Sequence, residues 1–238
     1  GMTAVVNKFQ RILGLRVHER FRDLALAPAR ERPVVFVTHM EHHSNQTSWL
    51  EALCDVRVID ADANGLVDLG ALDRLLDEYR ERPLKIASVT SCSNVTGLFT
   101  PYHDIAERMH RAGGLCFVDF ACSAPYIDID MRPPGRPEAQ LDAIFFSPHK
   151  FLGGPGTPGV LVFDQKLYRN RIPDNPGGGT VDWTNPWGEH KYVDDIEARE
   201  DGGTPGFLQA IRAALCVELK ESMSPARMLA REAELLAI

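Results

Sequence analysis

Short apolar runs alternate with longer amphipathic stretches along this chain. The apolar runs are rich in β-branched and aromatic residues and are short enough to be buried strands. Residues 69–80 and 102–112 instead repeat apolar side chains at helical spacing. Strands that alternate with helices predict an α/β fold with a mostly parallel sheet. The predicted strands are 34–38, 56–60, 85–90, 115–119, 143–146 and 159–163.

Chemically versatile side chains follow these predicted strands. His42 comes after the first strand, Asn94 comes after the third, and Asp119 ends the fourth. Lys150 follows the fifth strand. Ligands of open parallel sheets bind beyond the carboxyl ends of the strands. We therefore expect imidazole, amide, carboxylate and amine groups to meet at one edge of the sheet.

These groups suit an aromatic, phosphorylated aldehyde. Burial lowers the pKa of a lysine, and Lys150 is the candidate to condense with the aldehyde. Asp119 can keep a pyridine nitrogen protonated, which makes the ring a better electron sink. His42 can stack on the ring, and Asn94 can donate a hydrogen bond to its hydroxyl oxygen. Each role fits one edge of pyridoxal 5′-phosphate.

A phosphate group needs partners of its own. Ser147 and His149 lie close enough to Lys150 in the sequence to hold the phosphate of the same ligand. The glycines of 153–159 come after the lysine, whereas in a P-loop they precede it. We therefore expect these glycines to form a tight connection between two strands.

Five segments resemble, in order, the motifs of the class V aminotransferase family. Each motif is weak alone, but five in the same order are specific. The family has the type I pyridoxal-phosphate fold and includes cysteine desulfurases and selenocysteine lyases. The resemblance runs from about Thr3 to about Leu215. The segments are 41–45 (EHHSN), 93–97 (SNVTG), 118–121 (VDFA), 147–150 (SPHK) and 203–205 (GTP).

The resemblance assigns a role to each residue that contacts the cofactor ring. It implies that Lys150 is the Schiff-base lysine and that Asp119 is the partner of the pyridine nitrogen. It also implies that His42 stacks on the ring and that Asn94 contacts the ring hydroxyl. Cys122 stands where desulfurase relatives carry a glutamine near that hydroxyl, so this contact differs here.

The resemblance also implies which residues bind the phosphate. These are Ser147, His149 and Thr3, together with Thr204 from a neighbouring subunit. The expected assembly is therefore a homodimer in which Thr204 reaches the neighbouring site.

The resemblance predicts a three-layer α/β/α large domain. Residues 3–215 are expected to form this cofactor-binding domain, with an incomplete N-terminal part. Residues 216–238 are expected to begin the connection towards a small C-terminal domain that is missing. Cys216 falls in a predicted helix, 207–221, and is not assigned the role of a sulfur-carrying cysteine.

The expected activity is that of a pyridoxal-phosphate enzyme acting on an amino acid through an external aldimine. It is cysteine desulfurase-like or selenocysteine lyase-like, or an aminotransferase. The alternative is a non-catalytic or degenerate fragment that keeps the cofactor scaffold as a binding or interaction module. Truncation favours the alternative, whereas the intact set of Lys150, Asp119, His42 and Asn94 disfavours it.

The amino-acid composition limits the classes of binding partner that we expect. The 238 residues are 44% hydrophobic, which is enough for a sizeable core. The net charge of −7 gives no electrostatic reason for a nucleic-acid or anionic-membrane partner. No apolar run approaches the roughly 18 residues of a spanning helix. The five cysteines are scattered without a C-x-x-C pair, so we expect a reducing compartment, the cytoplasm.

Three further segments have open interpretations. Glu41 lies among His39, His42 and His43, but a strand-to-loop position lacks the helical spacing of a zinc motif, so no metal is expected. Residues 177–187 predict a flexible loop with two tryptophans as anchors, or an ordinary surface loop. Residues 224–238 predict an amphipathic helix.

Overall fold

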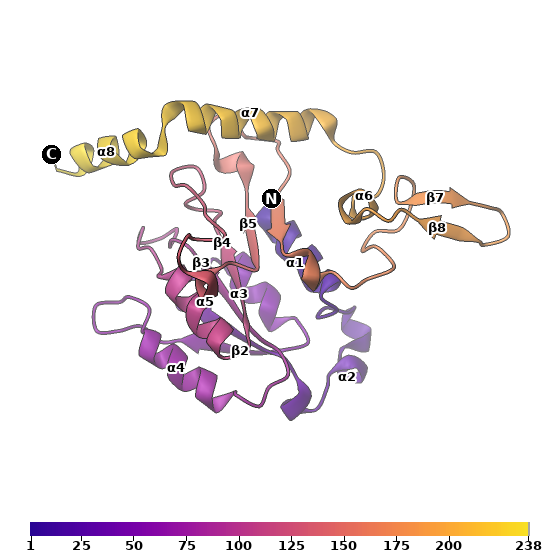
Figure 1. Ribbon diagram of the computed structural model, residues 1–238, viewed down its shortest axis with the longest axis horizontal. Helices are drawn as coiled ribbons and strands as arrows, with labels where there is room; N and C mark the ends of the chain where they lie inside the picture. Colours follow the sequence, from indigo (N-terminus) through magenta and orange to yellow (C-terminus); the bar gives the residue numbers. More distant parts are fainter. Residues whose placement is uncertain (238) are drawn as a thin grey trace.

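A six-stranded sheet forms the centre of the molecule in the computed structural model, which describes residues 1–237 (Figure 1). The strand order is β2-β1-β3-β4-β5-β6. The first five strands are parallel, and β6 runs antiparallel to β5. The predicted α/β fold is confirmed. The strands are β1 (Val34–Thr38), β2 (Asp55–Ile59), β3 (Lys85–Thr90), β4 (Leu115–Asp119), β5 (Ala143–Phe146) and β6 (Val160–Phe163).

Helices cover both faces of this sheet. Val34 and Phe36 belong to the core that contains α4 and α5, whereas Val35 and Val37 belong to the core that contains α1 and α3. Because both faces are buried, β1 is apolar along most of its length instead of alternating with polar residues. The result is the expected three-layer α/β/α arrangement. The helices are α1 (Met2–Ile12), α3 (His43–Leu50), α4 (Leu69–Glu78) and α5 (Tyr102–Arg111).

Helix α1 is held against the sheet by aromatic packing. Phe9 is fully buried, and its ring centroid lies 5.0 Å from that of Phe117 in β4 and 5.1 Å from that of Phe163 in β6. Val6 and Ile12 are buried on the same side of the helix, at the spacing of an amphipathic helix. This packing fixes the direction of α1, whose N-terminus points to the carboxyl edge of the sheet.

The connection from β5 to β6 is tight, as expected from its glycines. A Cβ on Gly154 would lie 1.9 Å from the carbonyl oxygen of Pro148, and one on Gly159 would lie 2.7 Å from that of Gly1. Strand β6 begins at Val160, one residue later than predicted. Strand β2 begins and ends one residue earlier than predicted.

The prediction of a loop at 177–187 was wrong. This region contains β7 (Val181–Thr184), which pairs with β8 (His190–Tyr192) in a hairpin that projects from the body (Figure 1). Asn185 closes the turn because its Oδ1 accepts the N–H groups of both Trp187 and Glu189, each at 3.0 Å. Trp187 is 84% exposed and does not anchor the segment.

The C-terminal part of the described chain is helical. After the short α6 (Ile196–Glu200), α7 (Phe207–Met223) crosses the top of the view in Figure 1 and continues into α8 (Pro225–Leu236). Cys216 is buried within α7, and Lys220 donates a hydrogen bond to the carbonyl of Ile127 at 2.6 Å. Residue 238, the last of the predicted terminal helix, lies outside the described residues. Within residues 1–237, no helix combines the length and the apolar character needed to cross a membrane.

Candidate active site

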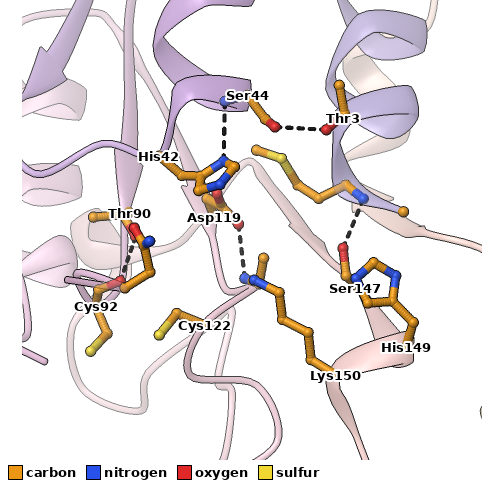
Figure 2. Close-up of a pocket in the computed structure, with 14 residues that line it drawn as sticks. Thr3, His42, Ser44, Thr90, Cys92, Asp119, Cys122, Ser147, His149 and Lys150 are labelled. Atoms are coloured by element: carbon orange, nitrogen blue, oxygen red, sulfur yellow. Dashed lines mark hydrogen bonds between the residues drawn. The ribbon is translucent and has the colours of Figure 1, made fainter. Parts of the chain in front are cut away.

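A cavity of about 220 Å³ opens at the carboxyl ends of β1, β3, β4 and β5 (Figure 2). The N-terminus of α1 closes it from the other side. Strand β2 lies on one side of β1 and β3 lies on the other, so the strand order reverses its direction at this point. The cavity lies at this topological switch point, where open α/β sheets bind ligands. Its lining residues include Thr3, His42, Ser44, Thr90, Cys92, Asn94, Asp119, Cys122, Ser147, His149 and Lys150.

Asp119 forms the buried anionic part of the cavity. It is the last residue of β4 and is 2% exposed. Its Oδ1 accepts the N–H of Ala121 at 2.8 Å. Burial raises the pKa of the Asp119 carboxyl to about 6, although the Ala121 N–H and the charge of Lys150 act in the opposite direction. A cationic group placed against this carboxylate would favour its ionised form.

Lys150 ends the short turn that follows β5, Pro148–Lys150. Its amine and the carboxylate of Asp119 line the same cavity (Figure 2). The residue is exposed, so the expected burial of its amine is not present in this structure. A ligand that fills the cavity would remove water from the amine.

His42 caps the N-terminus of α3 and lies near Lys150 in the cavity (Figure 2). Its Nδ1 accepts the N–H of Ser44 at 3.1 Å, so in the neutral ring the proton is on Nε2. Burial lowers the pKa of His42, and the nearby charges of Lys150 and His43 lower it further. His42 is thus a neutral, oriented ring that suits packing against an aromatic ligand.

The opposite end of the cavity is suited to an anion. The first N–H groups of α1 point towards it, and the positive end of the helix dipole favours negative charge there. Ser147 is 3% exposed, and its Oγ accepts the Met2 N–H at 2.8 Å. The hydroxyls of Thr3 and Ser44 share a hydrogen bond of 2.6 Å. His149 completes this polar group (Figure 2).

The remaining wall carries an amide and two thiols. Asn94 is exposed at this wall, beside Cys92 and Cys122. Burial raises the pKa of the Cys92 thiol to about 11, so this thiol stays protonated at neutral pH. The structure therefore brings together seven of the eight predicted site residues. Thr204 is exposed and is not among the residues that line the cavity.

Sequence reasoning missed two contributors to this region. The hydroxyl of Ser44 is hydrogen-bonded to that of Thr3 at the end of the cavity that is suited to an anion. The sequence signal for Ser44 was its place in the motif at 41–45, two residues after His42. Glu41 was considered only as a possible metal ligand, but its carboxylate accepts the backbone N–H groups of Thr38 and Thr90 and so joins the ends of β1 and β3.

The residues present fit a phosphorylated, cationic aromatic aldehyde. A helix N-terminus with hydroxyl groups, a neutral imidazole, a buried carboxylate and a lysine amine each meet a different part of such a molecule. The fold and the cavity together define the class of protein. It is a three-layer α/β/α domain with a cofactor-type pocket at the carboxyl edge of its sheet.

The family follows from comparison with known proteins. The model of the family described as aminotransferase class-V matches residues 23–238, so this chain belongs to that family. Proteins of the family depend on pyridoxal 5′-phosphate.

Individual relatives are named cysteine desulfurases. A probable cysteine desulfurase of Methanothermobacter thermautotrophicus is 34% identical over 179 residues, which is 74% of this chain and 42% of that protein. A probable cysteine desulfurase of Aeropyrum pernix is 30% identical, over 76% of this chain and 43% of that protein. The chain thus spans less than half the length of these curated relatives.

Solved structures show the same fold. The cysteine desulfurase CsdA of Escherichia coli, in an S-sulfonic acid form, superposes with a TM-score of 0.72 at 24% identity, over 92% of this chain and 50% of that one. The apo cysteine desulfurase of Thermococcus onnurineus gives a TM-score of 0.66 at 20% identity, over 95% of this chain and 57% of that one.

Proposed function

We propose that this chain is the pyridoxal 5′-phosphate-binding part of an enzyme of cysteine desulfurase type, which acts on an amino acid. One observation carries the proposal. Lys150, Asp119 and His42 come from three separate strand ends, yet they line one cavity whose far end is the N-terminus of α1. The names of the relatives, probable cysteine desulfurases, support the choice of cysteine as substrate.

Each side chain would have a defined task. When bound, pyridoxal 5′-phosphate supplies an electron sink for the α-carbon of an amino acid. Asp119 would hold the proton on the ring nitrogen, because its buried carboxylate is stabilised by an adjacent cation. Lys150 would hold the aldehyde carbon through its amine until the amino group of the substrate displaces it, and the freed amine would then carry the proton of the substrate's α-carbon. His42 would hold the ring plane from one side.

The phosphate would be held by side chains and backbone N–H groups at the N-terminus of α1, some of which are already oriented by hydrogen bonds. Ser147, Thr3 and His149 would donate to its oxygens together with the first N–H groups of α1. We further propose a homodimer in which Thr204 of one subunit donates to the phosphate in the other. Its exposed position outside the chain's own cavity supports this arrangement.

Cofactor binding is tested by absorbance titration of the chain with pyridoxal 5′-phosphate. We expect a shifted visible band that borohydride removes, and its loss in Lys150→Ala. The matched control is Lys166→Ala, since Lys166 is an exposed lysine outside the cavity and its loss leaves the band unchanged. An unshifted spectrum, or the same reducible band in Lys150→Ala, would contradict the assignment of Lys150 as the residue that binds the cofactor.

The reaction is tested separately by measuring alanine release from cysteine and from selenocysteine. Release from either by the loaded chain supports the desulfurase or lyase type. Cofactor binding without release supports the alternative, a scaffold that binds the cofactor without turnover.

A further inference from the structure

We propose that Glu41 is a positioning residue of the cofactor site: its carboxylate locks the ends of β1 and β3 and adds a second negative charge behind Asp119. This inference rests on the proposed function. It assigns a role in that function to one further residue, which does not line the cavity.

Glu41 is surrounded by hydrogen-bond donors. Its Oε1 accepts the N–H of Thr90 at 2.9 Å, the N–H of Thr38 at 3.2 Å and the hydroxyl of Thr38 at 2.6 Å. Its Oε2 accepts from Nδ2 of Asn45 at 2.7 Å. Thr38 ends β1 and Thr90 ends β3, so one carboxylate bridges two neighbouring strands at the edge of the cavity.

The surrounding network requires that Glu41 accept these bonds. Oδ1 of Asn45 already accepts from Oγ of Ser88 at 2.7 Å and from Nε1 of Trp49 at 3.2 Å, which fixes the amide so that Nδ2 faces Glu41. The hydroxyl of Thr38 accepts the N–H of Met40 at 3.2 Å, which leaves its proton for Glu41. The ionised carboxylate can accept all four of these hydrogen bonds at once, so the network stabilises the carboxylate over the protonated carboxyl.

Burial opposes that charge. Removal from water raises the pKa of Glu41 to about 7, and the charge of Asp119 acts in the same direction. Within residues 1–237, Asp119 is the titratable group whose charge acts on Glu41 across the strand ends, and Lys150 is the cation that faces Asp119. Asp119 thus lines the cavity, Glu41 lies behind it, and the amine of Lys150 faces Asp119.

This arrangement favours a ligand that brings positive charge to Asp119. A cationic ring nitrogen would interact with both carboxylates, directly with Asp119 and through space with Glu41. Glu41 also precedes His42 in the chain, so the bonds that fix Glu41 also fix the start of α3 and the His42 ring. The residue acts through its neighbours on both the charge and the geometry of the site.

The test compares Glu41→Gln with the unaltered chain by titration with pyridoxal 5′-phosphate and by the pH dependence of the bound cofactor's visible band. We expect a dissociation constant about tenfold higher, since hydrogen bonds to a buried charge are strong. We also expect the midpoint of the band's pH titration to move to lower pH, because loss of an anion disfavours the cationic form. Binding of inorganic phosphate, measured alone, should be unchanged.

Asp142→Asn is the matched control. Asp142 is a buried carboxylate at the other end of the sheet, where it accepts the N–H of Cys116 at 2.8 Å. This variant should lower the melting temperature and leave both the dissociation constant and the pH midpoint unchanged. A Glu41→Gln chain that behaves like Asp142→Asn in both readouts would overturn the proposal. An equal loss of phosphate and cofactor binding would overturn it too, because that pattern marks general loosening.

A second variant keeps the test decisive if Glu41→Gln does not fold. Thr38→Val keeps the shape of a buried β-branched residue and removes one donor to Glu41. It should shift the dissociation constant and the pH midpoint in the same direction by a smaller factor, and no shift would overturn the proposal. If the unaltered chain itself shows no bound band, the proposed function fails instead.

Discussion

At the scale of single residues, the site combines buried and exposed groups with different tasks. Asp119 is almost fully buried, whereas Lys150 and His149 are exposed around the same cavity. The buried carboxylate is held by the fold before any ligand arrives. The exposed amine and imidazole lose contact with water only when the cavity fills, so their chemistry depends on the ligand more than on the free chain.

Ser147 gives a residue-scale prediction. Ser147→Ala removes the acceptor of the Met2 N–H and one donor to a phosphate, so the affinity for pyridoxal 5′-phosphate should fall about tenfold. The measurement is absorbance titration. Pyridoxal, which lacks the phosphate, is the control ligand, and its affinity should not change. Equal losses for both ligands would show that Ser147 does not act at the phosphate.

At the scale of elements, the strands follow directly from local sequence. The ranges 34–38, 85–90, 115–119 and 143–146 were predicted without error, and their short β-branched or apolar runs are buried on both faces of the sheet. Asp119 ends one of these strands and Lys150 follows another, so their place at the edge of the sheet was predictable too.

Elements that depend on distant partners were less predictable. Helix α1 was not predicted although Val6, Phe9 and Ile12 stand at helical spacing, and its packing of Phe9 against Phe117 could not be predicted because the two residues are far apart in the sequence. The antiparallel direction of β6 depends on the tight connection before it, and the hairpin of β7 and β8 depends on a turn closed by Asn185. The role of Glu41 was missed because its partners come from two strands.

Phe9→Ala tests how much α1 depends on its packing. Phe9 is fully buried, so truncation should lower the free energy of unfolding by about 3–5 kcal/mol through lost burial and a new cavity. Urea denaturation measures this change. Leu24→Ala is the control, because Leu24 is 86% exposed and should change stability by less than about 0.5 kcal/mol. Similar effects for both would contradict the packing described for α1.

A buried pair between α5 and the loop before β5 predicts pH-dependent stability. Nε2 of His110 lies 2.8 Å from Oδ2 of Asp142, and this hydrogen bond is the main cause that raises the pKa of His110. A raised pKa in the folded state means that the stabilisation is fully present below the unfolded pKa, about 6.5, and is lost as pH rises through the folded value.

The comparison of His110→Gln with the unaltered chain isolates this contribution. The variant should be less stable by about 1–2 kcal/mol at pH 5.5, and the difference should shrink towards pH 9. Urea denaturation at several pH values measures it. A difference that stays constant across this range would show that the charge of His110 is not involved.

At the scale of the whole molecule, the described chain leaves much apolar surface uncovered. Helix α7 packs against the turn that carries Lys150 but buries only Cys216 fully. Several large apolar side chains exposed on one helix are typical of an interface. The exposed apolar residues of α7 are Phe207, Leu208, Ile211, Leu215, Val217, Leu219 and Met223.

The proposed exchange of Thr204 between subunits makes a prediction about mixed dimers. A hybrid of Thr204→Ala and Lys150→Ala chains has one site in which Lys150 meets an unaltered Thr204 of the neighbour. After unfolding and refolding as an equal mixture, tight cofactor binding should return at about one quarter of the sites. Titration that matches the average of the two separate variants would show that Thr204 serves no neighbouring site.

The central claim is that Lys150 is the residue at which this chain holds pyridoxal 5′-phosphate. The most direct measurement is borohydride reduction of the loaded chain, followed by proteolysis and mass analysis of the peptides. The account predicts a single stable cofactor adduct on Lys150. An adduct on other lysines with Lys150 unmodified, or no adduct at all, would contradict it.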